Sequence, residues 1–393
     1  MFSPNTHNPK PTNLVAFAFL LTAFLTGIAS SFQLPTLSLF LSQEINVSPI
    51  MVGNFYAINA VIGILLSQIL ARYSDKQEDR RKVIIFCCLI AVAGCLIFAY
   101  SRNYYVLVLF GTALLGLGSS SNPQSFALAR EYAGNTKHDA VMFTTIMRTQ
   151  ISLAWIVGPP LSFAIALNWG FDLMYLVAGL AFLLCALVSF TLLPKIVRTQ
   201  QIKTQELQDT PRTNRKSTMY LFIACFLMWT CNSMYLINMP LYIINELHLP
   251  KELGGTLMAT AAGLEIPIML LAGYLNKYFS KKQLMIIALA TGLTFYIGLF
   301  FAHETWQLLA LQILNAVLIG ITATIGMVYF QDLMPHQMGA ATTLFSNTAK
   351  SSWIIGGPLA GLLTQIWSYN SVFCISVLLL VASLVCMLKV KSV

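Results

Sequence analysis

Three charged residues, Arg148, Glu265 and Lys350, lie inside long apolar stretches of the sequence. A charge at membrane depth is unfavourable, so such residues mark either a functional site or a buried ion pair. Glu265 is the carboxylate nearest the middle of an apolar stretch. Its proton affinity would rise when a cation moves away and fall when the pair re-forms. We therefore interpret Glu265 as a candidate proton-coupling residue; the alternative is a static ion pair with Lys350 or Arg148.

The two cations could also act on a bound solute. Two cations and one anion leave an excess positive charge, which a substrate anion could balance. Alternatively, the cations could donate hydrogen bonds to hydroxyl groups. Arg148 has the better geometry for this role, because its planar guanidinium carries several donors.

The composition indicates that lipid covers most of this chain. Of the 393 residues, 57% are apolar and 9% are charged, whereas roughly 25% are charged in ordinary soluble domains. So few charges cannot cover the surface of a soluble fold. The formal net charge of +9 is spread over short clusters between apolar stretches. That distribution is typical of orientation signals and does not indicate a nucleic-acid partner.

The sequence contains no pattern for a metal, a cofactor or catalysis. The eight cysteines lie in apolar stretches without a CxxC pair, and the five histidines lie in expected loops or the tail; neither arrangement suits a zinc site. We also find no catalytic dyad and no phosphate-binding glycine loop. We therefore expect no cofactor and no enzyme activity.

Twelve stretches are suitable for crossing a bilayer. A helix needs about 20 apolar residues to span the hydrocarbon core, and the absence of water there makes helix the default. We therefore expect an all-α membrane protein with twelve transmembrane helices. The predicted spans are 14–41, 50–72, 83–100, 104–129, 141–167, 172–193, 219–244, 254–275, 284–302, 306–330, 339–366 and 372–388.

The basic residues predict the orientation of these spans. Alternate loops, counted together with both tails, hold 19 of the 23 Lys and Arg residues. The opposite loops hold only Arg102 and Lys251, and the remaining two basic residues lie within spans. Because basic loops stay in the cytoplasm, we expect both termini there.

The two halves of the chain are related by an internal repeat. When the fifth span is shifted by 198 residues, Trp155, Gly158 and Pro160 fall on Trp353, Gly356 and Pro358. A parallel repeat of six spans is an architecture of many secondary transporters. We therefore expect two pseudo-symmetric six-helix halves, 1–193 and 219–393, joined by a cytoplasmic linker at 194–218.

Several segments resemble known transporters. The loop Ala71–Lys82 resembles the loop signature of the major facilitator superfamily, although Ala71 replaces its first glycine. Longer segments throughout the chain are similar to the bacterial sugar efflux transporters of that superfamily. These segments are Pro35–Leu41, Phe126–Tyr132, Ser152–Trp155, Met228–Asn232, Ala261–Pro267 and Phe330–Pro335.

The resemblance implies a major facilitator fold and proton-linked export of sugars or sugar analogues across a bacterial inner membrane. The implied partners are a small sugar, protons and the lipid bilayer, and we expect the protein to act as a monomer. Two alternatives remain open. One is proton-driven export of amphipathic drugs, which would favour an apolar cavity, and the other is sugar uptake.

Sugar recognition requires polar groups around hydroxyls and aromatic faces over C–H surfaces. At mid-span depth, carboxamides and tryptophans could supply both, although interhelical hydrogen bonds and packing are equally compatible with them. The candidates for the substrate cavity, besides Arg148 and Lys350, are Gln33, Asn59, Asn122, Gln124, Gln150, Asn232, Asn238, Asn315, Trp155, Trp229 and Trp353.

The resemblance also implies a charged network that closes the cytoplasmic face. The alternative is a set of solvated loop charges, which would contribute little. Asp332 could pair with Lys277 or Lys281 in the second half. The gate candidates are Asp75, Arg81, Arg130, Glu131 and Asp332.

Overall fold

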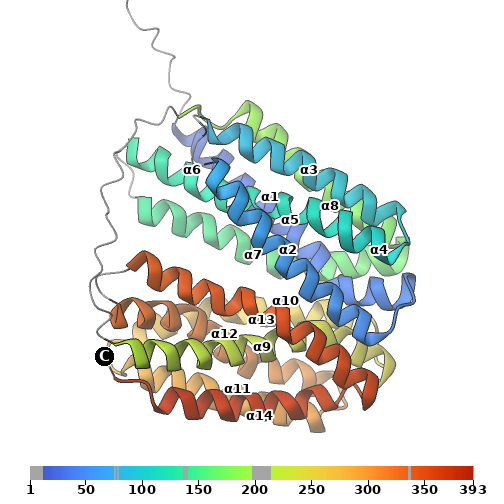
Figure 1. Ribbon diagram of the computed structural model, residues 1–393, viewed down its shortest axis with the longest axis vertical. Coiled ribbons are helices and arrows are strands. Elements are labelled where there is room, and N and C mark those ends of the chain that lie inside the picture. Colours follow the sequence, from blue (N-terminus) through green and yellow to red (C-terminus); the bar gives the residue numbers. More distant parts are fainter. Residues whose placement is uncertain are drawn as a thin grey trace, which may run out of the picture.

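The computed structural model describes residues 12–74, 77, 79–135, 140–196, 214–334 and 338–392. Within these ranges the chain is almost entirely helical and contains no strand. The helices run side by side as a bundle (Figure 1). The predicted linker falls largely on residues 197–213, which lie outside the described residues.

The first half of the bundle supplies six spans. The first and fourth spans each contain a π-helical turn: one ends the first span and the other interrupts the fourth. The sequence predicted that fourth span, 104–129, as one apolar stretch; in the structure it is built from four consecutive pieces. The elements are α1 (Thr12–Leu39), η1 (Phe40–Glu44), α2 (Pro49–Ser74), α3 (Arg80–Tyr100), α4 (Tyr104–Val106), η2 (Leu107–Gly111), α5 (Thr112–Ser119), α6 (Ser121–Asn135), α7 (Ala140–Trp169) and α8 (Phe171–Thr191).

The second half supplies six more helices, each without a π-helical interruption. Their bounds agree closely with the predicted spans; the largest shift is at the start of the seventh span, which begins at Arg215 instead of residue 219. The elements are α9 (Arg215–Asn245), α10 (Leu253–Leu275), α11 (Lys281–Phe301), α12 (Thr305–Leu333), α13 (Met338–Ile366) and α14 (Ser371–Leu388).

One span is more polar than the others. Eleven spans in the described part of the chain are long and apolar enough to cross a membrane, and α13 is not among them. It has the length, with 29 residues, but it carries Asn347, Lys350, Ser351 and Ser352 in its middle. A transmembrane helix with such a stripe must turn it toward protein or water instead of lipid.

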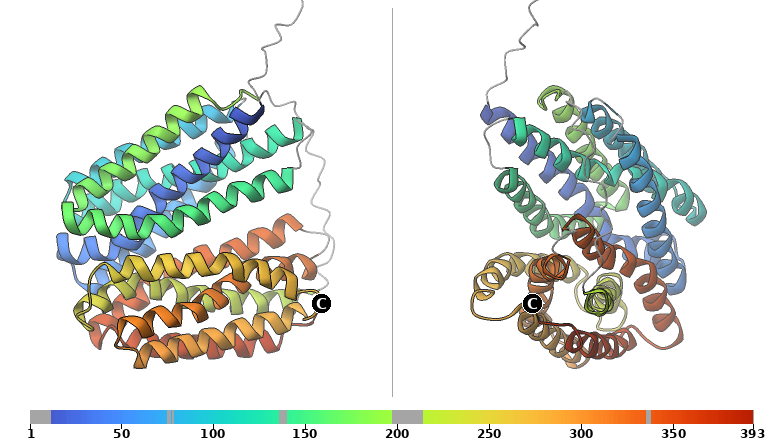
Figure 2. Two further views of the ribbon diagram at one scale, coloured as in Figure 1. Left: turned by 180° about the vertical axis from the view of Figure 1, so that it is seen from behind. Right: turned by 60° about the vertical axis from the view of Figure 1, so that its left-hand side comes forward.

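Each half has its own apolar core, which is why the bundle forms two bodies (Figure 2). One buried cluster is built around Phe19, Phe40 and Tyr175 of the first half, and another around Tyr235, Phe295 and Phe330 of the second. The end of the bundle where α1 begins and α14 ends is called the terminal side below, and the other end the opposite side (Figure 1).

The two halves repeat the same helix crossing. In the first, the Ser31 hydroxyl of α1 donates to the Ala154 carbonyl of α7 at 3.1 Å. In the second, the Ser233 hydroxyl of α9 donates to the Ser352 carbonyl of α13 at 3.3 Å. A Cβ on Gly158 or on its repeat partner Gly356 would collide with the respective serine Oγ. The glycines are therefore needed for close approach of the helices.

The halves meet each other through a second repeated contact, on the opposite side. A Cβ on Gly53 of α2 would collide with the Gly357 carbonyl of α13, and one on Gly255 of α10 would lie 2.9 Å from the Pro159 carbonyl of α7. Next to the first contact, Tyr56 and Trp353 stack across the halves with centroids 5.6 Å apart. From this closed end the ribbons of the two halves diverge toward the terminal side (Figure 1).

Candidate transport site

Arg148 and Lys350 face the region between the halves. Arg148 lies three turns before Pro159 on the same face of α7, and Lys350 lies two turns before Gly357 on α13. Since Pro159 and Gly357 touch the other half, residues spaced by whole turns point the same way. Both cations are exposed, and neither makes an ion pair with a described residue. They are thus accessible to a solute that enters from the terminal side.

Glu265 lies on a different face of α10. Gly320 of α12 packs against the backbone at Glu265 and the side chain of Ile268, so this face points into the second half. The Glu265 side chain is half-buried, and within the described ranges it has no cationic partner. The alternative of a static ion pair with Arg148 or Lys350 is therefore not realised in this conformation.

A buried polar network ties the terminal ends of the first half together. Its centre is Arg80, which pairs with Glu131 at 2.8 Å and donates to Ser74 and Gln124 at 2.9 and 2.7 Å. Ser74 also donates to Gln124 at 2.6 Å. Gln124, a candidate for the substrate cavity on sequence grounds, is thus held in this network by α2 and α3.

Arg81, the next residue along the chain, connects the start of α3 with the segment after α8. Arg81 pairs with Asp79 at 2.9 Å and donates to the Leu193 carbonyl just after α8. Burial raises the pKa of Asp79, but hydrogen bonds from Arg81 and the positive charges of Arg81 and Lys195 outweigh it. The pKa of this carboxyl therefore lies below its ordinary value of 3.8.

The second half has a corresponding network. Lys281 pairs with Asp332 at 2.5 Å, and Lys282 donates to the carbonyls of Leu388, the last residue of α14, and of Val390 just after it. Every ion pair between described residues lies within one half. Of the other gate candidates, Arg130 is exposed and Asp75 lies outside the described residues.

Several carboxamide candidates make structural hydrogen bonds. Asn238 donates to the Tyr369 carbonyl and accepts from Thr364. Asn315 donates to Gln312, while its carbonyl oxygen, like that of Asn232, is buried without a partner among the described residues. Asn122 and Gln150 are half-buried.

The three tryptophan candidates differ in their surroundings. Trp353 stacks on Tyr56 across the halves, so in this conformation its ring is part of the closed end. Trp155, its repeat partner, is half-buried. Trp229 is half-buried as well, and its indole N–H is buried without a partner in the described part of the chain.

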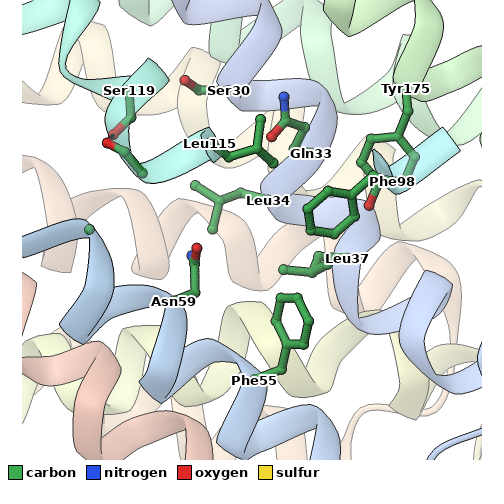
Figure 3. Close-up of a pocket in the computed structure, with 12 residues that line it drawn as sticks. Ser30, Gln33, Leu34, Leu37, Phe55, Asn59, Phe98, Leu115, Ser119 and Tyr175 are labelled. Atoms are coloured by element: carbon green, nitrogen blue, oxygen red, sulfur yellow. Dashed lines mark hydrogen bonds between the residues drawn. The ribbon is translucent and has the colours of Figure 1, made fainter. Parts of the chain in front are cut away.

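Gln33 and Asn59 meet in a cavity of about 140 Å³ within the first half (Figure 3). The cavity lies between α1, α2, α3, α5 and α8. Ser30, Ser119 and the Tyr175 ring also line it, together with Phe55 and Phe98. The structure thus brings two of the sequence candidates together, and neither Arg148 nor Lys350 is among the residues that line this cavity.

Sequence comparison identifies the family. The Major Facilitator Superfamily model matches residues 19–356 and, in an overlapping match, 221–392. Sugar efflux transporter A of Dickeya chrysanthemi is 55% identical over 97% of both chains. Sugar efflux transporter B of Salmonella typhimurium is 51% identical, covering 100% of this chain and 99% of the relative. The chain belongs to the sugar efflux transporters of the major facilitator superfamily.

Solved structures agree with this fold. The crystal structure of the nucleoside transporter NupG superposes on this sugar efflux transporter with a TM-score of 0.81 at 14% identity, covering 96% of this chain and 100% of that chain. A bacterial homologue of the lysosomal transporter Spinster, inward-facing and occupied, gives 0.82 at 11% identity over 97% of each chain. Both chains share the twelve-span fold of the major facilitator superfamily.

Sequence reasoning did not single out Arg80, Tyr56, Gly63 or Tyr175 in this sugar efflux transporter. The basic pair at 80–81 drew attention to Arg81, whereas Arg80 makes the buried contacts. The repeat contained the missing signal. Arg80 lies 201 residues before Lys281, and Glu131 lies 201 residues before Asp332. The sequence analysis considered the pair of Lys281 with Asp332, and the repeat would have extended that pair to Arg80 and Glu131.

Proposed function

We propose that this protein exports sugars or sugar analogues from the cytoplasm across a bacterial inner membrane, in exchange for protons. The observation that carries the proposal is the identity of 47–55% over 97% or more of the chain to relatives named sugar efflux transporters. Exposed cations between the halves and a partly polar cavity add support, because hydroxyl-rich solutes require hydrogen-bond donors and acceptors.

In this proposal the terminal side faces the cytoplasm. The basic residues gather in the loops and tails of that side, as the positive-inside rule requires. The halves contact each other on the opposite side, so the conformation is open toward the cytoplasm. Alternating access then proceeds by separating Gly53 from Gly357 and Gly255 from Pro159 while the terminal side closes.

Glu265 is the proposed proton site. It lies in the middle of a transmembrane helix, half-buried and without an ion-pair partner in the described residues. An isolated carboxylate in such surroundings binds a proton readily and gives it up when water or a cation arrives. Proton entry from the periplasm could thereby be linked to sugar exit.

The test uses inside-out vesicles with an acidic interior and a radiolabelled galactoside outside. Proton-driven export predicts accumulation that collapses with a protonophore. The Glu265→Gln variant should bind sugar but lose gradient-driven accumulation. Glu252→Gln is the matched control, because Glu252 is an exposed acid just before the same helix and should accumulate sugar normally.

Other outcomes separate the alternatives. Accumulation of amphipathic dyes without that of any sugar would identify a drug exporter. Sugar accumulation in right-side-out vesicles under an inward proton gradient would identify an uptake permease. Full gradient-driven transport in Glu265→Gln would remove Glu265 from the coupling mechanism and leave sugar export intact.

A further inference from the structure

The cavity in the first half has the size and chemistry of a site for a small polar solute. Its volume of about 140 Å³ corresponds to roughly ten water-sized positions, which is comparable with one sugar ring and too small for a disaccharide. Its lining is divided (Figure 3): the rings of Phe55, Phe98 and Tyr175 lie on one side, and Ser30, Asn59 and Ser119 on the other.

Hydrogen-bonding groups in this cavity lack protein partners. Tyr175 is fully buried, and its hydroxyl has no hydrogen-bond partner among the described residues. Asn59 likewise makes no hydrogen bond within the described ranges. Gln33 donates from its amide nitrogen to the Cys95 thiol at 3.5 Å, which leaves its carbonyl oxygen available. A buried polar group without a partner is unfavourable, so these groups favour an occupant that can bond to them.

The residues that line the cavity differ from their repeat partners in the second half. Ser31 and Ser233 make equivalent helix contacts in the two halves, and so do Gly53 and Gly255. Both pairs relate the first two helices of the halves by a shift of 202 residues. The same shift places Gln33 on Tyr235. Tyr235 is buried, packs edge-on against Phe295 and Tyr296, and bonds to Gln312.

The same shift places Gly63 on Glu265. Gly63 lines the cavity, and a Cβ there would meet nothing within 4 Å. Equivalent positions therefore hold a carboxamide and a glycine in the first half, and a larger tyrosine ring and a carboxylate in the second. At the position of Gly63, the open space of the first half thus corresponds to a carboxylate side chain in the second half.

We propose that this cavity binds one pyranose ring of the exported sugar. The inference rests on the proposed function and adds a binding site within the first half to it. Gln33, Asn59 and Tyr175 bond the ring hydroxyls, and the aromatic rings of Phe55 and Phe98 cover a C–H face of the sugar. Any second ring or aglycone extends outside the cavity.

Filling the cavity from Gly63 tests the site directly. Gly63→Leu introduces an apolar side chain into open space, and leucine favours the helix more than glycine does. Gly273→Leu is the matched control: Gly273 also has open space around its Cβ position and lies in the corresponding helix of the second half, away from the cavity. Binding of radiolabelled methyl galactoside and methyl glucoside to the purified full chain is measured by equilibrium dialysis.

Gly63→Leu should weaken sugar binding by at least about tenfold, while Gly273→Leu should bind like the wild type. Tyr175→Phe, which removes a single hydroxyl and leaves the ring packing unchanged, should weaken binding about three- to tenfold. It also covers the case in which Gly63→Leu does not fold.

Two results would overturn the inference in different ways. Wild-type affinity in both folded Gly63→Leu and Tyr175→Phe would place the sugar elsewhere while sugar export stands. A wild-type protein that binds none of the sugars would refute the proposed function, and the pyranose site with it.

Discussion

Arg80 and Lys281 are repeat-related residues, 201 positions apart, that make the same ion pair in the two halves. Each is the first residue of the third helix of its half, and each pairs with an acid near the end of the fourth span, Glu131 or Asp332. The following residues, Arg81 and Lys282, each donate to a carbonyl just after the last helix of their half, that of Leu193 or Val390. A two-residue basic motif thus fastens three helices in each half.

The two ion pairs should differ in strength. Arg80 and Glu131 are 8% and 23% exposed, whereas Lys281 and Asp332 are 18% and 35% exposed. Glu131→Gln should therefore destabilise the purified protein by about 2 kcal/mol, because it replaces a charge-assisted hydrogen bond to a buried guanidinium by a neutral one. Asp332→Asn should cost about 0.5 kcal/mol. Thermal unfolding in detergent measures both, and equal shifts would contradict the burial argument.

Gly158→Ala should destabilise the first half through its collision with Ser31. Overpacking of this kind costs about 1–3 kcal/mol. Adding Ser31→Gly removes the colliding atoms and should recover part of the loss, so a double-mutant cycle in thermal unfolding tests the contact. Gly263→Ala is the control, since nothing lies within 4 Å of its Cβ position. Additive losses from the two first-half substitutions would show that the crossing tolerates a methyl group.

Trp353→Leu should shift the conformational balance toward opening on the opposite side. The Tyr56–Trp353 stack joins the halves there, and an aromatic pair contributes about 0.5–1.5 kcal/mol. The ratio of the two conformations should change by up to about tenfold. Spin labels at the exposed positions Asn168 and Lys251, with exposed Cys374 replaced by serine, report the separation.

The matched control for this experiment is Trp367→Leu. Trp367 is exposed, directly follows α13, the helix that carries Trp353, and stacks on no described ring. A distance distribution unchanged by Trp353→Leu, or changed equally by both substitutions, would rule out the stack as the closing contact.

Arg148→Lys should reduce sugar transport about tenfold although the charge is kept. The exposed guanidinium has no ion-pair partner in the described residues, so its several donors are available to a solute. Vesicle uptake of a galactoside measures the loss. Arg215→Lys, at the exposed start of α9, serves as the control. Unchanged transport in Arg148→Lys would limit Arg148 to supplying charge.

The contribution of Asp79 should depend on pH. Its pKa is depressed in the folded state, so its stabilising effect is present above the ordinary carboxyl value and disappears as pH falls through the folded-state value. Asp79 caps α3 by accepting from the Arg81 backbone N–H at 3.1 Å. Because asparagine caps a helix as well as aspartate does, Asp79→Asn should cost only the ion pair with Arg81, about 0.5–1 kcal/mol at neutral pH. This cost should shrink as pH falls below the ordinary carboxyl value of 3.8 and through the folded-state pKa. A constant difference across this range would contradict the ion pair.

The fold was predictable because it depends on few, strong signals. Lipid imposes helices of a minimum length, and the tryptophans at 155 and 353 reveal the repeat. The repeat then appears in the structure as the same serine–carbonyl crossing in both halves. The π-helical turn in the fourth span was not predictable, since its residues Leu107–Gly111 read as ordinary apolar helix.

The site was less predictable, because side-chain neighbours depend on packing. Gln124 and Asn59 are both carboxamides in expected spans. One is bonded by Ser74 and Arg80, whereas the other lines a cavity. Nothing in the residue type separates these two environments. The cavity itself depends on Gly63, a residue whose contribution is the absence of a side chain.

The polarity of α13 has a consequence for biogenesis. A lysine at the centre of a lone helix raises the free energy of insertion by about 3 kcal/mol, and the serines and asparagine around Lys350 add to it. This segment is therefore the one least able to leave the translocon for lipid unaided. In the finished bundle α13 packs on α2 and α9, of which α2 is synthesised far earlier. The first half, which is synthesised first, therefore supplies a protein surface against which α13 can insert.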